Sequence, residues 1–164
     1  MTDLLGTVRR NHALEHATIT VLLGKLGRDI RMVGRATGDG YFLYGNVPTE
    51  LLEESTFEAL GRLKSGEGHL AVTPLCGTNI AVAGALTALA SAWALGSGKR
   101  RDNLAGAMVA SMLAVVAAQP VGRMVQRYLT TSPDLSDTEI VGIKPGGRGG
   151  MRFHKVQTAR RGAS

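Results

Sequence analysis

The chain has 164 residues, a formal net charge of +6, and 44% hydrophobic but only 4% aromatic residues. This length suits one compact unit with a sizeable core. So few aromatic residues argue against a stacking platform for single-stranded nucleic acid, and we expect no nucleic-acid partner. A single cysteine excludes an internal disulfide bond.

The first predicted element is a helix over residues 4–26, which Gly27 ends. Within it, His12 and His16 are one helical turn apart, so both rings project from the same face, and Glu15 lies on the adjoining edge. Two imidazoles at this spacing can hold one divalent metal, most often zinc. The alternative is a pair of buried histidines that hydrogen-bond to Glu15 or to backbone carbonyls. The cost of burying three ionisable groups in an otherwise apolar helix favours the metal.

The pattern His-x-x-Glu-His at residues 12–16 resembles the zinc-binding helix of the inverzincin metallopeptidases, the group of pitrilysin and insulin-degrading enzyme. In that family the two histidines bind zinc and the glutamate is the general base. The resemblance therefore implies zinc at His12 and His16 and a catalytic role for Glu15. It covers five residues of the chain.

Two short strands are expected next, over residues 30–35 and 41–44, with a Thr-Gly-Asp-Gly turn between them. A second helix is expected over residues 49–64. Its predicted N-cap is Thr49, and three glutamates near its start complement the positive end of the helix dipole. The alternation of residues 69–73 predicts a third strand.

Two runs without a charged residue follow, over residues 78–96 and 103–122. Each approaches the ~20 residues that a helix needs to cross a bilayer. A charged Gly-Lys-Arg-Arg-Asp loop at residues 98–102 joins them, and this arrangement predicts a membrane hairpin. The competing interpretation is a buried helical hairpin of a soluble protein, because alanine and glycine are only weakly apolar. Pro120 is expected to kink or end the second helix.

Small residues recur at every fourth position of both runs, which lets helix backbones approach closely within the hairpin or between subunits. These positions are Gly84, Ala88, Ala92, Gly96, Gly106, Ala110 and Ala114. The expected partners are therefore the lipid bilayer and a homo-oligomer or larger membrane complex. Trp93 and Tyr128 are the predicted anchors at the two membrane interfaces.

The C-terminal part predicts two more strands, over residues 138–144 and 151–156, joined by a glycine-rich loop and followed by a basic tail. They complete a small antiparallel sheet with the strands of the first half, because both ends of a membrane hairpin lie on one side. The expected fold class is α+β with a two-helix transmembrane hairpin. Its expected parts are residues 1–76, 77–127 and 128–164.

Three stretches together resemble an uncharacterised family of small bacterial membrane proteins, found in photosynthetic and related bacteria. They are Asn11–Ile19, the turn at Val47–Glu50, and Cys76–Asn79. The match spans most of the first half of the chain. This resemblance carries no established activity, so it supports the architecture and implies no substrate.

A zinc site needs a third protein ligand, and a catalytic site keeps water in the fourth position. The candidates are Cys76, His69 and Glu67. Cys76 lies just before the first uncharged run, where a helix N-terminus lowers the pKa of a thiol and favours the thiolate that zinc binds. The alternative role for Cys76 is that of a small buried hydrophobic residue. His69 fits better as a residue of the predicted strand.

No signal peptide is expected, because residues 1–10 contain no uninterrupted apolar stretch and no small-residue cleavage site. Lysine and arginine residues lie on both sides of the uncharged runs and favour opposite orientations. The missing signal argues against export of the N-terminal part. We therefore expect a multi-pass protein of the bacterial inner (plasma) membrane with its globular part in the cytoplasm.

The leading hypothesis is a zinc-dependent hydrolase of the membrane, in which His12, His16 and Cys76 hold Zn²⁺ and Glu15 activates a metal-bound water. A peptide bond is the substrate that the local resemblance suggests. The first alternative is a non-catalytic membrane subunit that oligomerises through its helical hairpin. A second alternative is a lipid- or cofactor-binding protein that uses the apolar helix face.

Overall fold

The structure is a computed structural model that describes residues 4–27, 30–96, 103–148 and 151–161. The chain forms two compact units. Unit 1 contains the described residues up to Thr73 and those from Arg127 onwards, and unit 2 is Pro74–Gln126. The charged loop expected at residues 98–102 lies outside the described residues.

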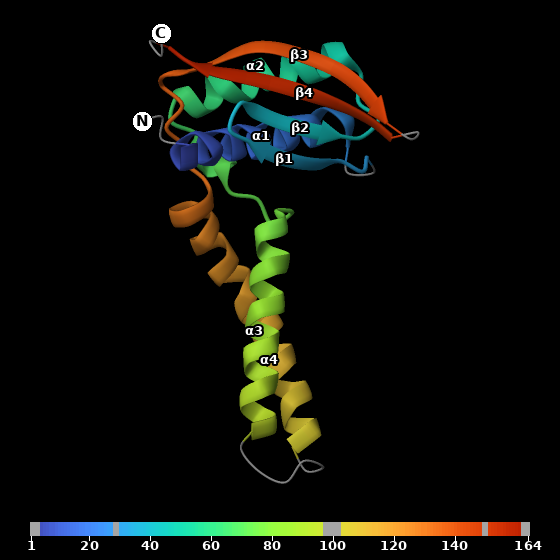
Figure 1. Cartoon of the computed structure of the whole chain (residues 1–164), viewed down its shortest axis with the longest axis vertical. Coiled ribbons are helices and arrows are strands. Elements are labelled where there is room, and N and C mark those ends of the chain that lie inside the picture. The colour runs from blue at the N-terminus through green and yellow to red at the C-terminus, as the bar shows by residue number, and fades with distance from the viewer. Residues whose placement is uncertain (1–3, 28–29, 97–102, 149–150, 162–164) are drawn as a thin grey trace. The chain divides into compact units, whose positions relative to one another are not determined.

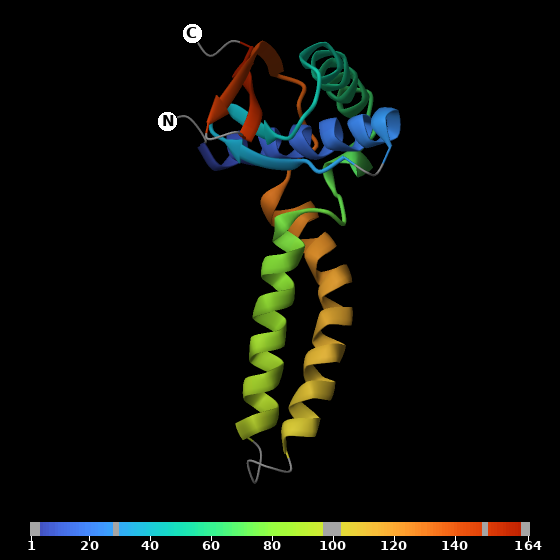
Figure 2. The same ribbon diagram turned by 90° about the vertical axis from the view of Figure 1, so that its right-hand side faces the viewer.

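Unit 1 consists of helices packed on one face of a four-stranded antiparallel sheet, as Figures 1 and 2 show. Its helices are α1 (Leu4–Leu26), α2 (Thr49–Lys64) and the short 3-10 helix η1 (Gly68–Ala71). Its strands are β1 (Val33–Thr37), β2 (Gly40–Tyr44), β3 (Thr138–Arg148) and β4 (Met151–Arg160), in the order β1-β2-β4-β3. The prediction of an α+β fold with a small antiparallel sheet is confirmed.

The core of unit 1 lies between α1, α2 and the sheet. Leu14 and Leu22 of α1 and Leu43 of β2 are fully buried there. Tyr41 is buried among them, and its hydroxyl donates to Thr18 Oγ1 at 2.9 Å. Burial raises the pKa of Tyr41, so the hydroxyl stays protonated and serves the core as a hydrogen-bond donor.

The strand predicted over residues 69–73 is wrong, because this stretch contains the 3-10 helix η1. The N–H of Leu70 donates to the carbonyl of Glu67, and that of Val72 donates to the carbonyl of His69. Leu70 and Ala71 are consecutive and both buried. A strand would point such neighbours to opposite faces of the sheet, whereas a tight helical turn can bury both.

The predicted N-cap of α2 is also wrong. Thr49 is the first helical residue, and Pro48 occupies the N-cap position without a side-chain hydrogen bond. The Thr49 hydroxyl instead lies 3.1 Å from Nε2 of His154 in β4. The Thr49 hydroxyl therefore bonds to a residue of a distant strand, and not to the backbone of the α2 N-terminus as the local sequence predicts.

The two C-terminal strands are longer than predicted. Pro145 and the residues after it, assigned to a loop from the sequence, pair with β4 as far as Arg148 opposite Met151. β3 is an edge strand, where a proline is tolerated because its missing N–H faces away from the sheet. The first four residues of the predicted tail, 157–160, continue β4 as far as Arg160.

His154 makes the stability of unit 1 depend on pH. It is 5% exposed, and its Nδ1 has no hydrogen-bond partner within the described part of the chain. Burial lowers the pKa of His154, so the unfolded chain binds a proton at His154 more readily than the folded protein does.

We expect the contribution of neutral His154 to the free energy of unfolding to be fully present above the unfolded pKa of ~6.5, and to be lost as the pH falls below it. The melting temperature of His154→Gln should therefore decrease less than that of the wild type between pH 7.5 and 5.5. An equal decrease in both proteins would contradict this assignment.

Unit 2 is a hairpin of two helices, α3 (Gly77–Gly96) and α4 (Asn103–Val125), which lie side by side in both views (Figures 1 and 2). Both are long and apolar enough to cross a membrane, a property that buried helices of soluble proteins can share. Pro120 lies inside α4 and does not end it. The chain then passes through a π-helical turn, η2 (Gln126–Thr130), at the boundary between the units.

Polar side chains join α3 to α4 and to the first residue of η2. The hydroxyl oxygens of Ser91 and Ser111 are 2.7 Å apart, and Nε2 of Gln126 donates to Oδ1 of Asn79 at 2.8 Å. A Cβ added at Gly122 would collide with the Asn79 side chain, so glycine makes this close approach possible. These contacts fix how the two helices face each other.

Candidate metal centre

The candidate centre lies on α1, the longest helix of unit 1. Asn11 and the stretch from Ala13 to Thr18 are buried, and His12 is half-buried. The rings of His12 and His16 are neighbours, with centroids 4.3 Å apart and an interplanar angle of 58°. The structure therefore brings together the two histidines that their spacing predicted to share a helix face.

Backbone carbonyls orient both rings. Nδ1 of His16 lies 2.7 Å from the carbonyl oxygen of Ala71, and Nδ1 of His12 lies 3.0 Å from that of Thr130. A carbonyl only accepts hydrogen bonds, so each Nδ1 carries a proton, and in a neutral ring Nε2 is then the nitrogen with the lone pair. This is the tautomer that metal-binding histidines adopt when their other ring nitrogen donates to a backbone carbonyl.

Nε2 of His16 is a polar atom of this site that lacks a hydrogen-bond partner within the described residues. The residue is 2% exposed, and this nitrogen has no hydrogen-bond partner within the described part of the chain. Leaving a buried acceptor unsatisfied costs about 1–3 kcal/mol, and such atoms are rare in folded proteins. A metal ion at Nε2 would remove this cost.

Glu15 points towards the sheet. It is 5% exposed, and its carboxylate lies so close to Gly34 of β1 that a Cβ at this position would collide with it. Gly34 therefore provides the space for the carboxylate. The negative charge of Glu15 also contributes to the raised pKa of Tyr41, although burial of the phenol is the larger cause.

Cys76 belongs to unit 2 and directly precedes α3. Its Sγ accepts a hydrogen bond from the N–H of Thr78 at 3.4 Å, a contact that favours the thiolate. Ala71, whose carbonyl orients His16, is five residues earlier in the chain.

The other two candidate ligands are placed elsewhere in unit 1. Glu67 forms a bidentate ion pair with Arg62, with a shortest distance of 2.7 Å, and this pair lowers the pKa of Glu67. The side chain of His69 is exposed in η1. Neither residue joins the two histidines.

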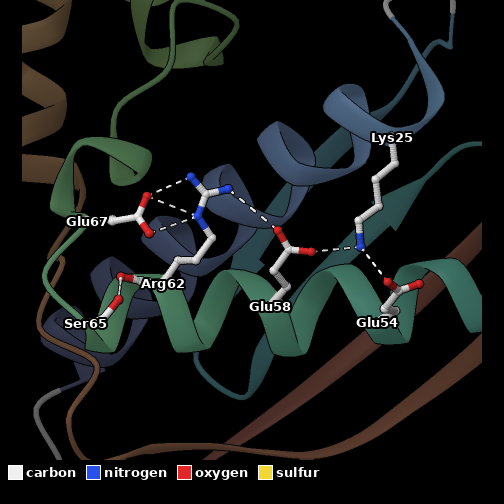
Figure 3. Close-up of polar contacts among 6 residues, drawn as sticks. All are labelled: Lys25, Glu54, Glu58, Arg62, Ser65 and Glu67. Atoms are coloured by element: carbon white, nitrogen blue, oxygen red, sulfur yellow. Dashed lines mark hydrogen bonds and ion pairs between the residues drawn. The ribbon is translucent and has the colours of Figure 1, made fainter.

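The ion pair of Glu67 is part of a chain of charges between α1 and α2, drawn in Figure 3. Lys25, at the end of α1, contacts Glu54 at 2.9 Å and Glu58 at 2.8 Å, and Arg62 contacts Glu58 from the other side. Because these groups are largely solvated, each pair contributes little to stability. The network connects two helices and provides no ligand for the candidate centre.

The sequence did not reveal three features of the centre. The carbonyls of Ala71 and Thr130 are backbone groups whose positions depend on the fold. Gly34 is one of 22 glycines, and nothing adjacent to it in the sequence indicates that it faces Glu15. Arg9 is three residues before His12 and therefore lies on the same face of α1, but the sequence does not indicate that its side chain binds backbone carbonyls of residues 128 and 131.

Comparison with known proteins identifies relatives without an assigned function. The model of a family described as a domain of unknown function, DUF6391, matches residues 7–143. An uncharacterised protein of Picosynechococcus sp. strain PCC 7002 is 36% identical over 140 residues, which cover 79% of this chain and 68% of the relative. No solved structure matches the chain. The expected resemblance to an uncharacterised bacterial family is confirmed, and the matches say nothing of zinc, peptidase activity or membrane insertion.

Proposed function

The chain belongs to the DUF6391 family, and we propose that it is a zinc-binding membrane protein in which His12, His16 and Cys76 hold the metal. The single observation that carries this proposal is the buried Nε2 of His16, which has no hydrogen-bond partner within the described residues. The orientation of both rings by backbone carbonyls supports it, because the same groups hold zinc-bound histidines in place.

Cys76 is the proposed third ligand for two reasons. Its position before α3 and the N–H of Thr78 both stabilise a thiolate, which is the form that binds zinc. The chain between Ala71 and Cys76 is also short. Two histidines and one cysteine would supply three protein ligands, which is the number that catalytic zinc sites use.

Glu15 is the proposed general base of a hydrolase, and a peptide bond is the proposed substrate. Zinc held by these residues would supply an activated water. Glu15 would accept a proton from that water as its oxygen bonds to the carbonyl carbon, and would return the proton to the leaving nitrogen as the C–N bond breaks. The support for this role is the position of Glu15 one residue before His16 in the His-x-x-Glu-His pattern of α1, since its carboxylate points towards β1.

The proposed location is the bacterial inner membrane, with α3 and α4 as spans and unit 1 in the cytoplasm. The exposure of these helices supports insertion. Asn79 and Ala94 are the buried residues of α3, and α4 buries Ala107, Ala118 and Gly122. Large apolar residues such as Leu89 and Met112 are more than two-thirds exposed, whereas the core helix of a soluble protein would bury them.

Metal analysis combined with Glu15→Gln tests this function. We expect about one zinc per chain in detergent-purified wild type and in Glu15→Gln, because the carboxylate is not a ligand. Hydrolysis of a fluorescence-quenched casein should fall by about 10²–10⁴-fold in the variant, which lacks the base. Gly34→Ala would displace the same carboxylate, because the added Cβ would collide with it. This variant should therefore also keep zinc and lose activity.

The two parts of the proposal can fail separately. Wild type with zinc but with no hydrolysis of casein would contradict the hydrolase and keep the metal site. Wild type without zinc, after purification in the absence of chelators, would contradict both.

A non-catalytic membrane subunit is the second candidate. The contact between the Glu15 carboxylate and Gly34 favours it, because this contact gives the residue a packing role in unit 1. The small residues along α3 and α4 would then allow a homo-oligomer to form through the hairpin. A wild type that contains no zinc and is oligomeric in detergent would support this candidate over the hydrolase.

A further inference from the structure

The face of α1 that carries the two histidines also carries Arg9. Nη2 of Arg9 donates to the carbonyls of Tyr128 and Thr131, each at 3.1 Å, on either side of the Thr130 carbonyl that accepts from His12. In return, the N–H of Ser132 donates to the carbonyl of Arg9 at 3.1 Å. Residues 128–132 are thus bound to the turn of α1 that begins the candidate centre.

His16 binds a second segment of unit 1 through the carbonyl of Ala71. These two segments have a common place in the chain. Ala71 is three residues before Pro74, where unit 2 begins, and Thr130 is four residues after Gln126, where unit 2 ends. One face of α1 therefore holds the chain both where it leaves unit 1 and where it returns.

We propose that Arg9 is a positioning residue of the zinc site. We also propose that zinc binding is coupled to the ordering of these two segments, which contain Ala71 and Thr130, on α1. Arg9 holds the backbone of residues 128–131 so that the Thr130 carbonyl orients the ring of His12. The Nε2 atoms would hold zinc, which would fix both rings, and each ring would then fix its carbonyl partner. This inference rests on the proposed metal site and assigns that site a further role. The site would hold the segments that precede and follow unit 2 in the sequence on α1.

Physical chemistry supports this coupling in both directions. Loss of a group that orients a metal-bound histidine typically lowers metal affinity by ~10–100-fold. If ordering the segment at residues 128–132 raises zinc affinity, zinc must order that segment by the same free energy. The hydrogen bonds of Arg9 to two carbonyls are charge-assisted, and its Nε is buried without a partner within the described residues. The guanidinium therefore gives up part of its hydration at this position.

Zinc titration of the full chain in detergent tests the role of Arg9. We expect Arg9→Gln to bind zinc ~10–100-fold more weakly than the wild type, and Arg9→Lys to recover part of the loss because its ammonium can still donate to a carbonyl. Arg10→Gln is the matched control. Arg10 donates to Thr7 within α1, so its loss should leave zinc affinity unchanged.

Hydrogen exchange of wild type with and without zinc tests the coupling itself. The N–H of Ser132 should exchange more slowly when zinc is bound, because its acceptor is the carbonyl of Arg9. A folded Arg9→Gln protein that binds zinc as tightly as wild type, or exchange at Ser132 that is indifferent to zinc, would overturn the inference alone. A wild type that binds no zinc would instead overturn the proposed function.

Discussion

His16→Ala is expected to abolish zinc binding by the purified protein. The substitution removes the buried Nε2 that carries the proposed site, and it also removes the donor to the Ala71 carbonyl. His12 and Cys76 alone do not make the set of three protein ligands that zinc sites require. Metal analysis should show a decrease from about one zinc per chain in wild type to almost none.

His69→Ala is the matched control, because His69 is an exposed histidine of η1 outside the candidate centre. It should keep the zinc content of wild type. The circular dichroism of His16→Ala should remain that of a folded α+β protein, since the cost of one unsatisfied carbonyl is about 1–3 kcal/mol. Full zinc occupancy in a folded His16→Ala protein would mean that the metal binds elsewhere.

Gly40→Ala is expected to cause the largest loss of stability among glycine-to-alanine changes at the described glycines of unit 1. Gly40 begins β2 with φ +134°, a backbone conformation that residues with a side chain rarely adopt. The added Cβ would also collide with the backbone carbonyl of Val156 in β4. Because neither strand can move without losing its partners, we expect the free energy of unfolding to fall by at least ~3 kcal/mol, measured by chemical denaturation.

Gly24→Ala adds the same methyl group where nothing opposes it. Gly24 lies in α1, and no heavy atom is within 4 Å of the position of the added Cβ. Replacing a glycine by alanine in a helix stabilises it by about 0.5–1 kcal/mol, so this variant should be more stable than wild type. If Gly40→Ala were as stable as wild type, the strand pairing at this turn would have to be different.

The helices could be predicted from the sequence because the signals that define them are local. α1 ends where glycine follows it, and α2 lies between Pro48 and the Ser-Gly pair at residues 65–66. The two uncharged runs predicted α3 and α4 for the same reason, because the length and composition of a run are also local properties of the sequence. The 3-10 helix η1 was mistaken for a strand because a short apolar run has too few residues to show a period.

The strands were predicted less well because their ends depend on their neighbours. Nothing local to Pro145 indicates that it joins a sheet edge, and the register that places it opposite His154 is a property of the whole sheet. The candidate centre shows the same division. The spacing of His12 and His16 is local and could be read from the sequence, whereas the carbonyls that orient them come from segments 55 and 118 residues away.

The order of the strands has a consequence for how the protein is made. β4 follows β3 in the chain, yet it lies between β2 and β3 in the sheet. A ribosome therefore completes β1, β2 and the whole of unit 2 before it makes the strand that pairs with β2. Until then β2 exposes an unpaired edge, the kind of surface on which nascent chains misassociate. Unit 2 is thus synthesised, and can fold, before β4 pairs with β2 and completes the sheet of unit 1.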